Sequence, residues 1–145
     1  MDQSASFGVR DAARRSTRTL DDDTLERLMT LPPCPHVVVT VDASEISDSR
    51  TFHNAFLEAF GFPHFYGRNM SAWIDCMTDL DDPEDGLSTV QAPAGGVVVL
   101  KLDHAEAFAK RCPEIYAELV ECAAFVNWRR LEIGQGPILA IAFHR

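Results

Sequence analysis

The sequence predicts a small α/β domain with a three-stranded parallel sheet and helices in a β-αα-β-αα-β order. Three continuous apolar runs carry this prediction: VVVTV at 37–41, VVVLKL at 97–102 and ILAIAF at 138–143. None of them alternates polar with apolar residues, which is typical of strands covered on both faces and therefore of a parallel sheet. The segments between the runs have helical periodicity, so we expect pairs of helices that form right-handed crossovers.

The length of 145 residues favours one domain. Residues 1–19 are polar and poor in large apolar side chains, so we expect a mobile N-terminal segment. The stretch LDDDTLERLMTLPP predicts a short helix over 20–31, with Asp21 as its N-cap and Pro32 and Pro33 as its stop. We therefore expect an extension over 1–33 and the α/β domain over 34–145.

Two helices are predicted between the first two strands. The first spans 50–60 and ends before Gly61 and Pro63. The second follows a tight turn in FYGRNMSAWIDCMTDLDD, residues 65–82. Its apolar residues recur at spacings of three and four and predict one buried stripe of Met70, Trp73, Ile74, Met77 and Leu80.

Two further helices are predicted between the second and third strands. Asp103 and Glu106 have the spacing of a capping box for a short helix that Pro113 interrupts. Residues 114–130 then form an amphipathic helix, and Arg129 and Arg130 suit the negative end of its dipole. Its buried stripe is predicted to contain Ile115, Leu119, Cys122, Ala123 and Val126.

The charge of the chain indicates the kind of partner. The net charge is −9, and four Arg and two Asp give residues 1–19 a charge of +2, which leaves −11 for residues 20–145. A domain with this much negative charge repels phosphate backbones and anionic membranes, and it attracts basic proteins. Solubility alone also explains an acidic composition, so charge by itself leaves both interpretations open.

Composition also bears on the compartment. No apolar run approaches the roughly 20 residues that span a bilayer, and no hydrophobic block at the N-terminus indicates a secretory signal. The four cysteines, at 34, 76, 112 and 122, match neither paired metal clamps nor a disulfide framework. We therefore expect a reduced, cytoplasmic protein.

Catalytic, metal and cofactor sites have little support in the sequence. There is no glycine-rich phosphate loop, and the acidic stretch DLDDPEDG at 79–86 does not fit the frame of an EF-hand, so we expect a solvated loop and no metal. Asp42 and Ser44 follow the first strand, where α/β sheets bind ligands, and Lys101 lies in the second. A phosphate-handling enzyme that uses Asp42 is therefore an alternative, although Asp42 and Ser44 suit a turn better. We expect no cofactor.

The helix after Phe65 and Tyr66 has a short polar face. At helical spacing Ser71, Asp75, Thr78 and Asp82 fall on one line with Asp79 beside it. Gly67 allows close approach to the backbone of the preceding turn, and Asn69 is a good N-cap. An exposed aromatic next to carboxylates is typical of a protein-binding surface. A helix with one solvated face and Phe65 in the core is the alternative.

These residues resemble the barstar family, intracellular inhibitors of barnase-type ribonucleases. The family hallmark Tyr-Tyr-Gly-x-Asn-Leu-Asp-Ala-Leu-Trp-Asp-Cys-Leu-Thr corresponds to FYGRNMSAWIDCMT in this chain. The identical positions are Tyr66, Gly67, Asn69, Ala72, Asp75, Cys76 and Thr78. The order of strands and helices over 37–145 also agrees with the family's three-stranded parallel sheet.

The resemblance implies inhibition by occlusion. In the family, the corresponding helix and turn insert into the ribonuclease active site, and their carboxylates take the place of RNA phosphates. Asp75 falls on the central carboxylate, and Gly67, Asn69 and Thr78 fall on contact positions. The chain departs from the hallmark at Phe65, Ser71 and Ile74, where the family has tyrosine, an acidic residue and tryptophan. The family also uses a glutamate late in its last helix, for which Glu132 is one candidate.

We therefore predict a non-catalytic inhibitor or immunity protein that binds a basic ribonuclease or a ribonuclease-type toxin. The alternative is a non-inhibitory scaffold of the same fold that binds another basic protein. The predicted contact residues are Asp75, Phe65, Tyr66, Gly67, Asn69, Ser71, Thr78 and Asp79.

Overall fold

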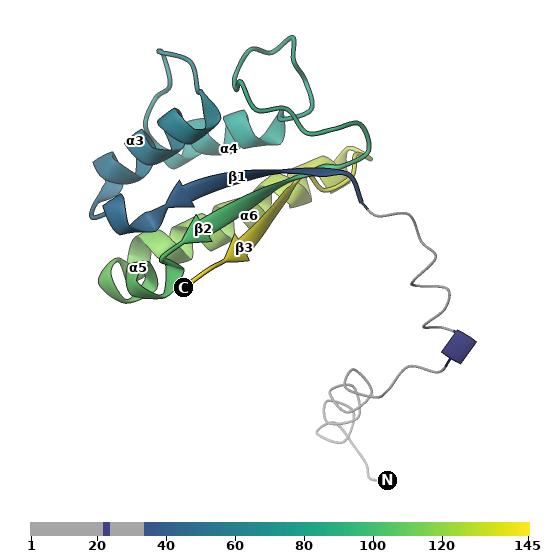
Figure 1. Ribbon diagram of the computed structural model, residues 1–145. Coiled ribbons are helices and arrows are strands. Elements are labelled where there is room, and N and C mark those ends of the chain that lie inside the picture. The colour runs from purple at the N-terminus through teal and green to yellow at the C-terminus, as the bar shows by residue number, and fades with distance from the viewer. Residues whose placement is uncertain (1–21, 24–33) are drawn as a thin grey trace, which may run out of the picture. The chain divides into compact units, whose positions relative to one another are not determined.

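Three parallel strands lie at the centre of the fold: β1 (His36–Asp42), β2 (Val97–Asp103) and β3 (Leu139–Phe143). The structure is a computed structural model, and it describes residues 22–23 and 34–145. The spatial order is β1-β2-β3, with Val38 opposite Val99 and Val99 opposite Ala140 (Figure 1). The predicted α/β class, strand positions and parallel pairing are confirmed. The helix predicted over 20–31 lies outside the described residues, except that Asp22 and Asp23 are helical.

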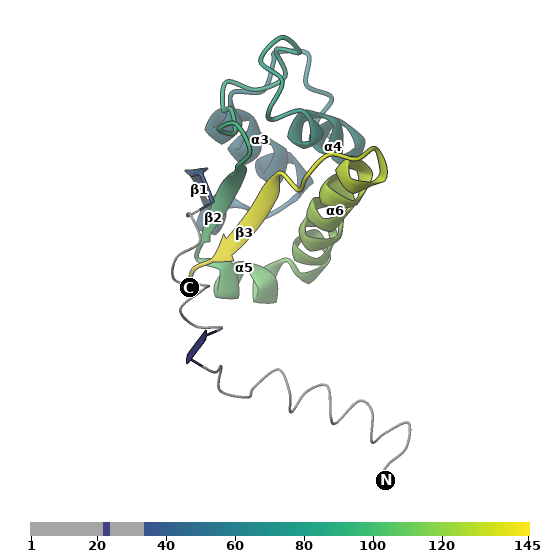
Figure 2. The same ribbon diagram turned by 90° about the vertical axis from the view of Figure 1, so that its right-hand side faces the viewer.

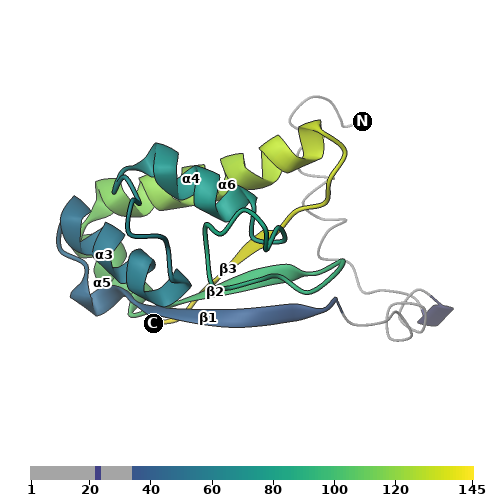
Figure 3. The ribbon, with the colours of Figure 1, turned by 90° about the horizontal axis from the view of Figure 1, so that it is seen from above.

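One face of the sheet packs against the helices. Val98, Leu100 and Leu102 of β2 are completely buried on this face, together with Val41 of β1 and Leu139 of β3. Figure 3 shows α3, α4 and α6 on the same side of the strands. On the other face Val38 is 54% exposed. The expectation that both faces are covered is therefore wrong for residues 34–145, because the valine-rich runs reflect strand propensity as well as burial.

Two helices follow β1 and the short 3-10 helix η1 (Ala43–Glu45). The helix α3 (Ser49–Phe60) begins at a capping box between Asp48 and Thr51 and ends at Gly61, whose φ of 63° is left-handed. The helix α4 (Met70–Thr78) ends before Asp79, so the last acidic residues of the predicted polar face lie beyond the helix. Its predicted stripe does face the core, where Trp73 packs edge-on against Phe56 with ring centroids 5.7 Å apart.

The second pair of helices is α5 (Ala105–Arg111) and α6 (Pro113–Glu132). The predicted capping box at Asp103 and Glu106 is wrong. His104 is the N-cap residue, in a left-handed conformation and without a side-chain capping bond. The Asp103 carboxylate is instead within 3.1 Å of the Lys101 ammonium and 3.2 Å of His144. The break at Pro113 and the buried stripe of α6 are confirmed.

A long segment without helix or strand connects α4 to β2, and hydrogen bonds hold it at both ends. The Ser88 hydroxyl donates to the carbonyl of Phe60 at 2.6 Å, and the Thr89 amide donates to the same carbonyl at 3.0 Å. The Ala92 amide donates to the carbonyl of Leu80 at 2.8 Å. Because the Leu80 side chain is completely buried, the segment is anchored directly behind the end of α4.

The helices α4 and α6 pack side by side (Figure 2), and Arg130 joins them. Its side chain is buried, and its guanidinium donates to the carbonyl oxygens of Thr78 at 2.9 Å and Gly136 at 2.7 Å. It also binds both carboxylate oxygens of Asp81, at 3.0 and 2.8 Å. Arg130 therefore connects the C-terminal end of α4, the following loop and the chain that enters β3.

Replacing Arg130 with alanine should destabilise the domain by about 3 kcal/mol, because two carbonyl groups lose their charged donor. Chemical denaturation followed by circular dichroism measures the change. Arg129→Ala is the matched control, since Arg129 is the adjacent residue and is paired at the surface, where an ion pair contributes less than about 1 kcal/mol. Equal losses for the two variants would contradict the role of Arg130.

Candidate protein-binding surface

The turn before α4 is fixed by hydrogen bonds. Asn69 is the N-cap of α4: its side-chain oxygen accepts from the Ala72 amide at 2.8 Å, and its side-chain nitrogen donates to the carbonyl of Gly67 at 3.3 Å. Arg68 has a left-handed φ of 55°, and its guanidinium donates to the side-chain oxygen of Asn54 on α3. Gly67 is exposed at the tip. The sequence predicted the cap, and the structure adds that the Asn69 amide is engaged within the turn.

The two aromatic residues of the turn point in opposite directions. The Phe65 side chain is 68% exposed, so the alternative that placed it in the core is wrong. Tyr66 is buried, and its hydroxyl lies 2.6 Å from Nδ1 of the buried His53. Burial raises the pKa of the Tyr66 phenol and lowers the pKa of His53, so both groups are neutral in this contact. The Tyr66 side chain therefore supports the turn from the core side, and its contact with a partner stays a prediction.

The polar face of α4 is shorter than predicted. Ser71 and Asp75 are exposed, but Thr78 is only 9% exposed and its hydroxyl donates to the carbonyl of Ile74 at 2.6 Å. The placement of Thr78 on the solvated face is wrong, because α4 ends at Thr78 and this end packs against α6, where Arg130 donates to the Thr78 carbonyl. Asp82 lies beyond the helix, so it does not continue the predicted line. The exposed face of α4 is thus limited to its first two turns.

Asp75 is 64% exposed, and it forms an ion pair within the chain. Its carboxylate lies 3.2 Å from the Arg129 guanidinium of α6. The Arg129 guanidinium also lies over the Phe125 ring, 5.9 Å from its centroid. Exposed ion pairs contribute at most about 1 kcal/mol to stability, so a cationic group from outside the chain can replace Arg129 beside Asp75 at low energetic cost. Asp75 therefore faces solvent, but its negative potential is partly neutralised.

The loop after α4 concentrates negative charge. Asp79 is half-buried, and its pKa is raised to about 6, first by burial and then by the neighbouring Asp85 carboxyl and the charges of Asp82 and Asp81. Asp81 differs, because its hydrogen bonds with Arg130 hold the pKa of its carboxyl below the usual value. Among the described residues, no group of His, Cys, Asp or Glu is arranged to hold a metal ion. The raised pKa of Asp79 therefore places the change in its charge near pH 6.

The sequence does not indicate the contacts that Arg68 and Arg129 make. The local signal for Arg68 was weak, because its partner Asn54 lies on a different helix. The position of Arg129 near the end of its helix predicts only a favourable interaction with the helix dipole. The sequence does contain a signal for an exposed aromatic surface. Phe125 and Trp128 lie three positions apart on the helix and outside its buried stripe.

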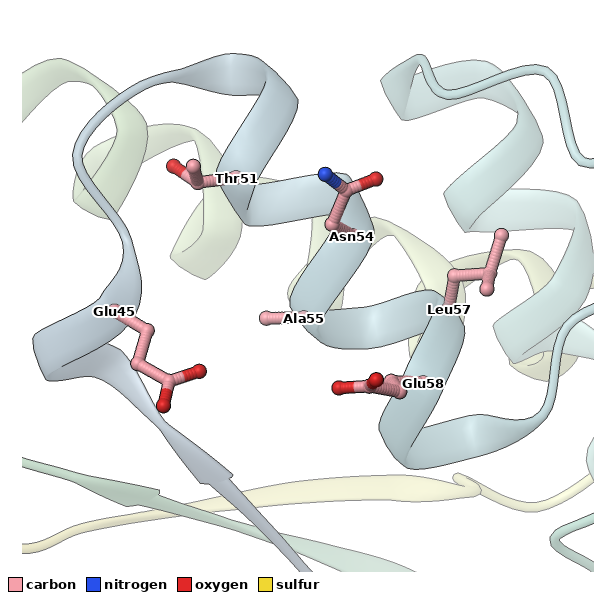
Figure 4. A pocket seen from close by; sticks show the side chains of 6 residues that line it. All are labelled: Glu45, Thr51, Asn54, Ala55, Leu57 and Glu58. Carbon is pink, nitrogen blue, oxygen red and sulfur yellow. The ribbon is translucent and has the colours of Figure 1, made fainter.

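The alternative site at Asp42 is poorly suited to phosphate. The Asp42 carboxylate accepts from the Ser44 amide at 3.0 Å and from its hydroxyl at 2.7 Å, as expected for a turn. A shallow cavity of about 360 Å³ lies between η1 and α3, where the carboxylates of Glu45 and Glu58 point towards each other (Figure 4). A second cavity, of about 220 Å³, shares these two residues and reaches Asp42. Three carboxylates repel an anionic ligand.

No helix among the described residues has the length and apolar character needed to cross a membrane. A comparison with curated protein sequences found no match. The family model described as Barstar (barnase inhibitor) matches residues 36–135, which is about two thirds of the chain and includes the whole of the turn and α4. That span runs from the first residue of β1 past the end of α6, so it contains β1, β2 and the helices that follow them, whereas β3 lies beyond it. The chain belongs to the barstar family.

Proposed function

We propose that the protein binds and inhibits a basic ribonuclease, or a ribonuclease-type toxin, by inserting α4 and its preceding turn into the enzyme's active site. The single observation that carries the proposal is the exposed Asp75 carboxylate on the capped first turns of α4. Membership of a family described as barnase inhibitors supports the ribonuclease as the class of partner. The protein itself has no catalytic role in this proposal, and it needs no cofactor.

The proposed contact surface is smaller than the sequence suggested. It consists of side chains and backbone that face solvent around the turn and α4: Phe65, Gly67, Asn69, Ser71, Asp75 and, at the rim, Asp79. Tyr66 and Thr78 fix the shape of this surface from the core side. Because the turn is held by hydrogen bonds before binding, little conformational entropy is lost when a partner docks.

The electrostatics favour a partner with a cationic pocket. Residues 20–145 carry a charge of −11, which accelerates the encounter with a basic protein. At the site, the partner's cation has to replace Arg129 beside Asp75. In this proposal, the arginines and lysines that bind RNA phosphate in the ribonuclease make this exchange, and the RNA is then excluded.

The cellular role that fits best is immunity of the producing cell against its own or a neighbour's ribonuclease. Four free cysteines are compatible with the reducing cytoplasm, where such an inhibitor has to act. The alternative of a non-inhibitory scaffold that binds another basic protein is favoured by two observations: Ser71 lacks the second carboxylate of the family hallmark, and Arg129 neutralises part of Asp75.

The variant Asp75→Asn should weaken binding to a barnase-type ribonuclease by about 2–5 kcal/mol, because a desolvated cation of the enzyme loses its partner. Isothermal titration with the purified enzyme measures the affinity, and residual ribonuclease activity measures inhibition. Glu58→Gln on α3 is the control, since it removes one exposed carboxylate outside the proposed surface. Unchanged inhibition by Asp75→Asn would refute the site, and a wild-type protein that inhibits no such enzyme would favour the scaffold alternative.

Binding should strengthen as the pH rises from 5 to 8. Asp79, with a pKa of about 6, is mostly protonated at pH 5 and mostly ionised at pH 8. A cationic partner favours the ionised form, so affinity increases as the pH passes through this pKa, and binding below it releases a proton. Titrations at several pH values with wild type and Asp79→Asn isolate this contribution from groups that titrate on the partner. Identical pH profiles for the two proteins would exclude Asp79 from the surface.

A further inference from the structure

The outer face of α6 exposes aromatic surface that the core does not use. Leu119, Ala123 and Val126 face the interior and are buried. Phe125 and Trp128 point away from the core and are 43% and 53% exposed, and their rings stack with centroids 5.5 Å apart and an interplanar angle of 27°. Single exposed apolar residues are ordinary, but a contiguous patch usually marks an interaction surface.

This aromatic pair is continuous with the surface around Asp75. Arg129 contacts both parts, because its guanidinium lies 3.2 Å from the Asp75 carboxylate and 5.9 Å from the centroid of the Phe125 ring. Trp128 stacks on Phe125 on the side of the helix away from the core. A path of direct contacts therefore runs from α4 across Arg129 to the outer face of α6.

The charges around the aromatic pair indicate which kind of protein could bind to it. Glu121 lies one turn before Phe125 and Glu132 lies one turn after Trp128, and both are exposed. Within the described part of the chain, neither of them takes part in an ion pair. A second copy of this acidic chain would bring like charges together at this face, whereas a basic protein would bring complementary ones.

We propose that Phe125, Trp128 and Arg129 form the second half of the partner-binding surface and that they take an apolar patch beside the cationic pocket of the same basic partner. The inference rests on the proposed function, and it specifies the partner further: its active site has to be bordered by apolar surface. Trp, Phe and Arg are the residue types that concentrate binding energy at the centres of interfaces. The Arg129 side chain, once displaced from Asp75, remains over the Phe125 ring and at the centre of the contact.

The test uses the full-length protein and a catalytically inactive barnase-type ribonuclease as the probe. Phe125→Ala and Trp128→Ala should each weaken binding at least tenfold. Val120→Ala is the matched control, because Val120 is 39% exposed on the same helix but lies two turns before Trp128. It should change the affinity less than twofold. Circular dichroism of each variant checks that the fold is intact.

Fluorescence gives a second measurement that requires no mutation. Trp73 is completely buried, so acrylamide quenching of the free protein reports mainly on Trp128. Adding the inactive ribonuclease, corrected for the enzyme's own emission, should reduce the quenching of Trp128 at least twofold.

The outcomes separate the two proposals. Tight binding by wild type with unchanged affinity of both aromatic variants and unchanged quenching would overturn the role of α6 and leave the inhibitor function standing. Absence of binding by wild type would overturn the proposed function, and with it this extension of the surface.

Discussion

The geometry of the candidate surface depends on the hydrogen bonds of the buried Arg130 guanidinium. It donates to the carbonyl of the last residue of α4, to both oxygens of Asp81 and to the carbonyl of Gly136. Three separate parts of the chain are thereby held at fixed positions around one cation. A planar group with five donors suits this arrangement, and a lysine in its place would satisfy fewer acceptors. The position of Asp75, one turn before the end of α4, follows from this arrangement.

The two neighbouring arginines of α6 have opposite relations to water. Arg130 points inward and is almost completely buried, whereas Arg129 points along the surface to Asp75. The first contributes to the rigidity of the fold. The second neutralises an exposed carboxylate without ordering anything in the core, so it is available for exchange with a cation from outside. Neighbouring residues of α6 thus support the candidate surface from the core side and neutralise part of its exposed negative charge.

The fold was predictable from the sequence because its main signals are local. Three apolar runs, the helical stripes and the capping residues Asn69 and Gly61 each act within a few residues. The family hallmark located α4 and its turn. The long-range contacts were not predictable, because Arg129 and Asp75 are 54 positions apart and Arg130 and Thr78 are 52 apart. The same limit explains why the burial of Thr78 at the end of α4 and of Tyr66 in the preceding turn could not be predicted: contacts with the rest of the fold bury these side chains.

In the proposed complex, Asp75 and its surroundings occupy the place of an RNA phosphate in the ribonuclease. Competition between the protein and a nucleotide for a catalytically inactive barnase-type enzyme tests this mode of binding most directly. The account predicts strict competition: the apparent dissociation constant of the protein complex rises in proportion to the concentration of the nucleotide, with no ternary complex. A protein complex whose affinity does not change when the enzyme is saturated with nucleotide would contradict it.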